Sequence, residues 1–170
     1  MRLASFVLIA LAGCSITDFD IDQPVPEQHV QGSPLPGPLA TLFPLQLDLD
    51  ISQKIKAQET GPIDSVTLSS LELNITATDR PSGDTDDWSF VDSVQVFVSS
   101  TKSGTTLPRV EIAHGDHPGA VQKFKFVVDG DVNLKDYIDE GSMVESSSSG
   151  TAPPDDTSFD GKSTFTVHPL

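Results

Sequence analysis

The sequence predicts an all-β protein, an antiparallel β-sandwich with one short helix. Three observations lead to this prediction. Short segments in which apolar and polar residues alternate recur along most of the chain, turns rich in Gly, Pro and Asp separate them, and only one stretch has the spacing of a helix. The 170 residues are enough for a single domain with its own core. An open barrel is the alternative architecture.

The first 13 residues have the layout of an export signal. Arg2 supplies a positive charge, and residues 3–12 form an apolar run that is too short for a stable transmembrane helix. The run ends in Leu-Ala-Gly-Cys (residues 11–14), which resembles the lipobox of bacterial lipoprotein precursors. The resemblance implies cleavage before Cys14, a diacylglyceryl group on its thiol and acylation of the new amino terminus. An ordinary secretory signal is the alternative.

The same resemblance implies a location. A lipid on Cys14 would anchor the mature chain in the cell envelope, with the membrane as its partner. In well-studied Gram-negative lipoproteins an Asp directly after the lipidated cysteine retains the protein at the inner membrane, so Ser15 implies the outer membrane. Cys14 is the only cysteine, and a lipid would account for an otherwise unpaired thiol in an exported chain.

The charge of the chain argues against nucleic-acid partners. The sequence has 10 basic and 25 acidic side chains, which gives a net charge of −15. Removal of the signal takes away Arg2 and no acidic residue, so the mature chain carries −16. Such a surface repels DNA, RNA and anionic lipid head groups.

Residues 14–40 read as a lipidated, proline-rich tether, which leaves 41–170 as the single folded domain. Prolines that interrupt regular pairing stand at Pro24, Pro26, Pro34, Pro36 and Pro38. Asp18, Asp20 and Asp22 alternate within this stretch, but the Gly and Glu that complete an EF-hand loop do not follow. We therefore interpret these aspartates as part of a solvated linker.

Two strands are predicted in the first half of the domain. Residues 41–51 alternate between apolar and polar side chains, as in a strand with one wet face. A polar stretch that ends in a turn follows over residues 53–62. The second strand spans 66–78, and its apolar phase slips by one residue at Ser69-Ser70. Such a slip indicates a β-bulge, with two shorter strands as the alternative.

The second half of the domain contains four further predicted strands, separated by polar loops. The segment 90–99 is the best core candidate, because β-branched and aromatic residues crowd it. The predicted strands are 90–99, 107–113, 121–128 and 161–168, and the predicted loops are 79–87, 114–119 and 146–156. Strands of this number and spacing suit a two-sheet sandwich, immunoglobulin-like or similar.

The one predicted helix lies near residues 133–140. Asn133 is a suitable N-cap, Asp136 stands three residues later as in a capping box, and Gly141 is a stop signal. The apolar side chains that would share one face are Leu134, Tyr137 and Ile138.

Acidic loops are the first candidate site. Loops at one end of a sandwich can converge and offer the six to eight oxygen ligands that Ca²⁺ takes. The candidates are Asp84, Asp86, Asp87, Asp129 and Asp131. Aspartate is also common in turns, where it bonds to its own backbone. We therefore expect no bound cofactor, with a structural Ca²⁺ as the alternative.

A second candidate metal site is the loop with His114, Asp116 and His117, whose spacing could hold zinc or copper if a further ligand came from elsewhere. Ser99 and Lys102 match the S-x-x-K pattern of penicillin-binding proteins. No helix is predicted there, so a polar turn is the better interpretation.

The sequence thus favours a membrane-anchored envelope lipoprotein that acts without catalysis, as a binding or structural module whose protein or glycan partner is not specified. One alternative is a metal- or carbohydrate-binding accessory domain. Another is a hydrolase that uses the acidic loops or the histidine-bearing loop.

Overall fold

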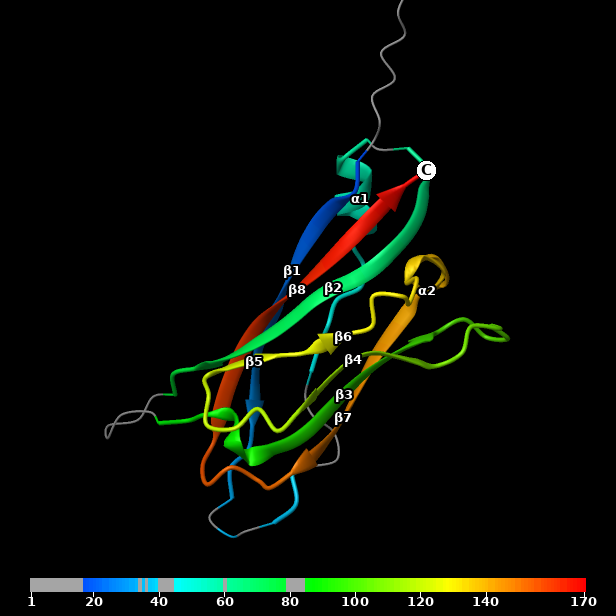
Figure 1. Cartoon of the computed structure of the whole chain (residues 1–170). Helices are drawn as coiled ribbons and strands as arrows, with labels where there is room; N and C mark the ends of the chain where they lie inside the picture. Colours follow the sequence, from blue (N-terminus) through cyan, green and yellow to red (C-terminus); the bar gives the residue numbers. More distant parts are fainter. Residues whose placement is uncertain (1–16, 34, 36, 40–44, 60, 79–84) are drawn as a thin grey trace, which may run out of the picture.

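The protein is an antiparallel β-sandwich of two four-stranded sheets (Figure 1). The structure is a computed structural model that describes residues 17–33, 35, 37–39, 45–59, 61–78 and 85–170. One sheet has the strand order β1-β8-β2-β5, and the other has the order β6-β4-β3-β7. The elements are β1 (Phe19–Val30), α1 (Ser52–Ala57), β2 (Ile63–Thr76), the 3₁₀ turn η1 (Trp88–Phe90), β3 (Val91–Ser100), β4 (Val110–Asp116), β5 (Lys123–Lys125), β6 (Val127–Val128), α2 (Lys135–Glu140), β7 (Ser142–Gly150) and β8 (Thr157–Pro169).

The first strand corrects the prediction of a tether. Within the stretch interpreted as a linker, β1 pairs with β8 from Phe19, opposite Val167, to Val30, opposite Thr157. Asp20 and Asp22 face water and alternate with buried side chains at Ile21, Gln23 and Val25. Pro24 and Pro26 are tolerated because β1 is an edge strand, where a missing N–H leaves no partner unpaired, and the register shifts just after Val25. Residues 19–30 therefore belong to the folded domain, which was predicted to begin at residue 41.

The neighbouring strand β2 confirms the predicted bulge. Its register against β8 shifts between Leu68 and Ser70, where the apolar phase of the sequence slips. Val66 and Leu68 are buried before the shift, and Leu71 and Leu73 are buried after it. The extra residue thus keeps apolar side chains on the core face along the whole strand.

The other sheet has one strand that the sequence analysis missed. The segment predicted as the loop 146–156 begins inside β7, which pairs with β3 from Ser100, opposite Ser142, to Val91, opposite Gly150. β7 is rich in serine, so its sequence shows no alternation of apolar and polar residues. It is a strand because it pairs with β3, which is strongly apolar and forms hydrogen bonds with a strand on each side. Similarly, β4 continues through His114 to Asp116, into the predicted loop 114–119.

The prediction of a strand over residues 41–51 is wrong for the part that the structure describes. Residues 41–44 lie outside the described part of the chain, and residues 45–51 belong to neither sheet. Their burial nevertheless alternates as predicted, with Leu45, Leu47, Leu49 and Ile51 inside the core. The segment leads into α1, a single short helix where the sequence indicated only a polar turn.

The core lies between the two sheets and centres on Trp88. This side chain is fully buried, and its ring lies 5.5 Å from Phe124, 5.3 Å from Phe159 and 5.7 Å from Phe90. β5 is an edge strand of one sheet, and β6, the next strand along the chain, is an edge strand of the other sheet. The chain passes between the sheets here and closes one side of the sandwich. Every buried residue of the described chain lies between Ile21 and Val167, so residues 15–170 keep this core complete.

The predicted helix is confirmed as α2. The N-cap position is Leu134 rather than the predicted Asn133, and no side chain caps the helix. The Asn133 Oδ1 atom instead accepts hydrogen bonds from the Lys135 backbone N–H at 3.0 Å and from Val66 N–H at 3.2 Å. Gly141 ends the helix with a positive φ of 87°. Because Leu134 N–H donates to the Val66 carbonyl, α2 is fixed beside β2.

Both helices lie at the same end of the sandwich as the start of β1 and the C-terminus, which we call the α1 end (Figure 1). Leu170 N–H donates to the Pro62 carbonyl, and Ile63 stands opposite Pro169. The Lys54 ammonium donates to the Asp22 carbonyl and so fastens α1 to β1. The opposite end, which holds η1, we call the η1 end. No helix in the described part of the chain is long and apolar enough to cross a membrane.

Candidate functional site

The acidic residues proposed for Ca²⁺ do not form one group. Asp84 lies outside the described residues. Asp86 and Asp87 lie with Asp155 around a small cavity at the η1 end, whereas Asp129 and Asp131 lie on the connection from β6 to α2, toward the α1 end (Figure 1).

Two of these aspartates bond locally to the backbone. Asp87 Oδ1 accepts from Ser89 N–H at 2.9 Å, and Asp129 Oδ1 accepts from Asp131 N–H at 3.1 Å. Such bonds to nearby backbone N–H groups are the usual role of aspartate in turns, which was the alternative to a Ca²⁺ site.

The histidine-bearing segment is divided between a strand and its end. His114 and Asp116 lie on the outer face of β4, and His117 follows with a positive φ of 44°. His114 Nδ1 lies 2.9 Å from Glu111 Oε1, and Gln95 Nε2 donates to Glu111 Oε2 at 2.8 Å. Across the described residues, no three His, Cys, Asp or Glu side chains come together as metal ligands.

The outer face near His114 also carries hydroxyls, but they are engaged elsewhere. Ser93 Oγ lies 2.8 Å from Ser149 Oγ on the neighbouring strand, although Ser93 and His114 line the same shallow hollow. The histidine is paired with a carboxylate, yet no hydroxyl is hydrogen-bonded to it in the contacts of the described chain. The arrangement is that of a polar sheet surface.

The S-x-x-K stretch is a polar turn, as the sequence indicated, and it holds α2 in place. The Glu140 carboxylate accepts hydrogen bonds from Ser100 Oγ at 2.8 Å, Thr105 Oγ1 at 2.6 Å and the Lys102 ammonium at 3.0 Å. These donors, the Thr105 hydroxyl first, hold the pKa of Glu140 at about 2 instead of its ordinary 4.5. The carboxylate therefore links the end of α2 to the β3–β4 hairpin.

We predict that this link weakens in acid. The unfolded chain takes up a proton near pH 4.5, but the folded carboxylate does so only near pH 2, so falling pH favours unfolding between these values. The melting temperature of Glu140→Gln should lie below that of the parent above pH 5, and the gap should close as the pH falls to 2. Ser100→Ala combined with Thr105→Ala should weaken the same pH dependence. A gap that stays constant from pH 7 to pH 2 would contradict this role of Glu140.

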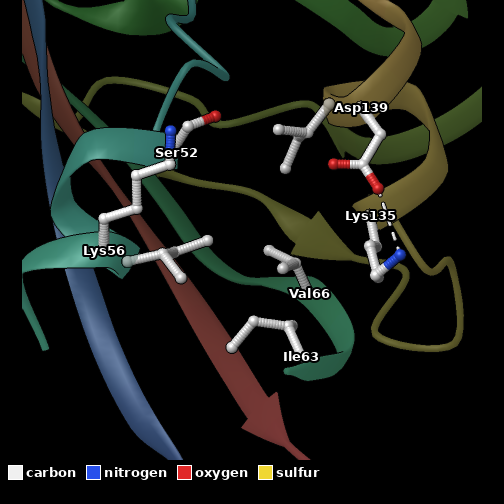
Figure 2. A pocket seen from close by; sticks show the side chains of 8 residues that line it. Ser52, Lys56, Ile63, Val66, Lys135 and Asp139 are labelled. Atoms are coloured by element: carbon white, nitrogen blue, oxygen red, sulfur yellow. Dashed lines mark hydrogen bonds and ion pairs between the residues drawn. The ribbon is translucent and has the colours of Figure 1, made fainter. Parts of the chain in front are cut away.

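A pocket with an apolar floor lies between the two helices at the α1 end, and we call it the interhelix pocket (Figure 2). Its volume is about 280 Å³. Three residues of α1, three of α2 and two of β2 line it: Ser52, Ile55, Lys56, Lys135, Ile138, Asp139, Ile63 and Val66. Each helix presents one face at the spacing i, i+3 and i+4, which brings three side chains to the same side.

The pocket is apolar at its base and charged at its rim. Val66 is buried, and Ile55, Ile63 and Ile138 are half-buried against the core. Figure 2 shows Ser52 and Lys56 on the α1 side and Lys135 and Asp139 on the α2 side, with Ile63 and Val66 between them.

The charges of the rim are one ion pair and one separate ammonium. The Lys135 ammonium lies 3.1 Å from Asp139 Oδ2, and the hydrogen bond that it donates to that carboxylate raises the pKa of Lys135. Lys56 has no carboxylate within 4.0 Å among the residues that the structure describes.

Sequence reasoning missed this pocket because α1 itself was not predicted. Only the α2 half carried a signal, the shared face of the predicted helix. The chain matches no protein-family model, and comparison with curated proteins gives no significant match. Proposals about its function therefore depend on its own residues.

Proposed function

We propose that this chain is a lipid-anchored protein of the bacterial cell envelope, in which the β-sandwich serves as a binding or structural module without catalysis. The observation that carries the proposal is the Leu-Ala-Gly-Cys sequence at residues 11–14, which follows a positive charge and an apolar run. The lipid would be joined to Cys14, and Ser15 directly after it favours the outer membrane as the location.

The position of β1 sharpens this proposal. Only four residues separate Cys14 from Phe19, the first residue of β1. Five Cα–Cα steps span at most about 18 Å when fully extended. A lipid on Cys14 would therefore hold the domain against the membrane surface, with the α1 end toward the lipid and the η1 end away from it.

The charge of the chain supports acyl chains, rather than surface attraction, as the source of membrane affinity. A net charge of −15 is repelled by anionic head groups. Acyl chains supply about 0.8 kcal/mol for each buried CH₂, and two or more chains make the attachment stable.

Substitution of the cysteine tests the proposal. Cells that express the parent chain or Cys14→Ser are grown with radiolabelled palmitate, and their membranes are separated from soluble protein. We expect label on the parent chain alone, a mutant chain that keeps residues 1–13, and parent protein in the outer-membrane fraction. Ser15→Ala serves as a control that keeps Cys14 and should still be labelled. Palmitate on Cys14→Ser would refute the proposed anchor.

A further inference from the structure

We propose that the interhelix pocket binds an aliphatic carboxylate, a single unbranched chain that ends in a carboxyl group. The base of the pocket supplies the apolar contact for such a chain. Four branched aliphatic side chains converge there from three elements: Ile55, Ile63, Val66 and Ile138. Three of them remain partly open to solvent in a domain that otherwise buries most of its large apolar side chains, so a ligand would remove further apolar surface from water.

The rim favours a negative head group. Lys56 and Lys135 contribute two positive charges and Asp139 one negative charge, so the lining has a net charge of +1 in a chain whose net charge is −15. Asp64 and Asp136 also act on Lys135, but they do not line the pocket. Because Asp139 is already paired with Lys135, the Lys56 ammonium and the Ser52 hydroxyl are the groups that can receive a carboxylate.

The size of the pocket restricts the ligand to one chain. A volume of about 280 Å³ lies just below the range for small-molecule sites, which is roughly 300–1,000 Å³. Two acyl chains and a glycerol would exceed it, so a diacyl lipid does not fit. An aliphatic carboxylate of medium length places its apolar part on the isoleucines and its head group at the rim.

This inference does not depend on a lipid at Cys14, because every residue that lines the pocket lies between Ser52 and Asp139. The two proposals can therefore fail separately. If both hold, the pocket lies at the membrane-facing end of the domain, where a fatty acid that leaves the bilayer would first meet the protein.

Calorimetric titration of residues 15–170 tests the pocket with hexanoate, octanoate and decanoate. Each methylene that enters an apolar site tightens binding roughly fourfold. We expect the dissociation constant to fall along this series and then to level off once the pocket is full. Decyltrimethylammonium and methyl decanoate, which carry a positive and a neutral head group, should bind at least roughly threefold more weakly than decanoate.

Two variants and a control locate the binding. Lys56→Glu reverses the rim charge and should weaken decanoate binding roughly tenfold, whereas Lys125→Glu makes the same change in net charge on β5, outside the pocket, and should leave binding unchanged. Ile55→Trp should fill the pocket and abolish binding. The melting temperature of each variant confirms that it is folded.

Three results would overturn the inference: no saturable binding of any carboxylate, equal binding by methyl decanoate, or full affinity in folded Ile55→Trp. The methyl ester matters because the chain's own acyl groups on Cys14 would be esters or amides. Equal binding by the ester would point to those groups rather than to a free carboxylate.

Discussion

Replacing Ile21 by aspartate is expected to destabilise the entire domain severely. Ile21 lies on β1 with only 4% of its surface exposed, and its side chain packs in the core. The substitution removes apolar contacts and places an unpaired carboxylate in an apolar environment. We expect a loss of about 4 kcal/mol or more in the free energy of unfolding, which is a large part of the stability of a small domain. Urea unfolding of residues 15–170, followed by circular dichroism, measures it.

A control on the same strand separates packing from charge. Asp20 is adjacent to Ile21 but faces water, and its Oδ1 accepts a hydrogen bond from Thr166 Oγ1 at 2.7 Å. Asp20→Asn keeps the shape of the side chain and should change stability by less than about 1 kcal/mol. If Ile21→Asp were as stable as the parent, β1 would be a dispensable linker and the register with β8 would be wrong.

Replacing Gly161 by alanine is expected to destabilise the sheet by about 2–4 kcal/mol. Gly161 stands on β8 between β1 and β2. A Cβ atom at this position would lie 2.3 Å from the Glu72 carbonyl oxygen and 2.7 Å from Leu73 Cδ2. The nearer contact is with backbone, so the strands themselves must separate.

The same substitution at Gly130 is the matched control. A Cβ atom there would meet no atom within 4 Å, and the backbone conformation is one that other residues adopt. Gly130→Ala should therefore be neutral or slightly stabilising, because alanine restricts the unfolded chain more than glycine does. Melting temperatures of the two variants give the comparison. Equal melting temperatures would show that β2 and β8 are not packed as closely as the structure indicates.

The strands that sequence reasoning predicted well are those whose own residues alternate. β2 and β3 both carry apolar residues in alternation, and even the bulge of β2 between Leu68 and Ser70 follows from a slip in its apolar phase. The helix α2 was also predictable, because Asn133 just before its start and its stop at Gly141 are local signals, although the N-cap position is Leu134.

The strands that it missed are formed by their partners. β7 is rich in serine and acquires strand structure from pairing with β3, which a local pattern does not reveal. In β1 the alternation of Asp20, Ile21 and Asp22 was present, but prolines later in the strand outweighed it. Whether Pro24 and Pro26 face a partner depends on the position of β1 at the edge of its sheet, and that position is a property of the whole fold.

The candidate site could not be predicted for a related reason. The interhelix pocket joins residues that are far apart in the sequence, such as Ile55 and Ile138, through a short helix with no strong signal of its own. The sequence instead drew attention to aspartates such as Asp87 and Asp129, whose contacts are local. Proximity in the folded chain, rather than residue type, distinguishes the pocket from these turns.

The central claim is that a lipid on Cys14, close to the start of β1, holds this sandwich at the membrane, and mass spectrometry of the amino-terminal peptide tests it most directly. The protein is extracted from its native envelope with detergent and digested. We predict a peptide that begins at Cys14 and carries a diacylglyceryl group on sulfur and an acyl group on its amine. A mature protein that begins at Met1, or one in which Cys14 bears a free thiol, would contradict the proposed function.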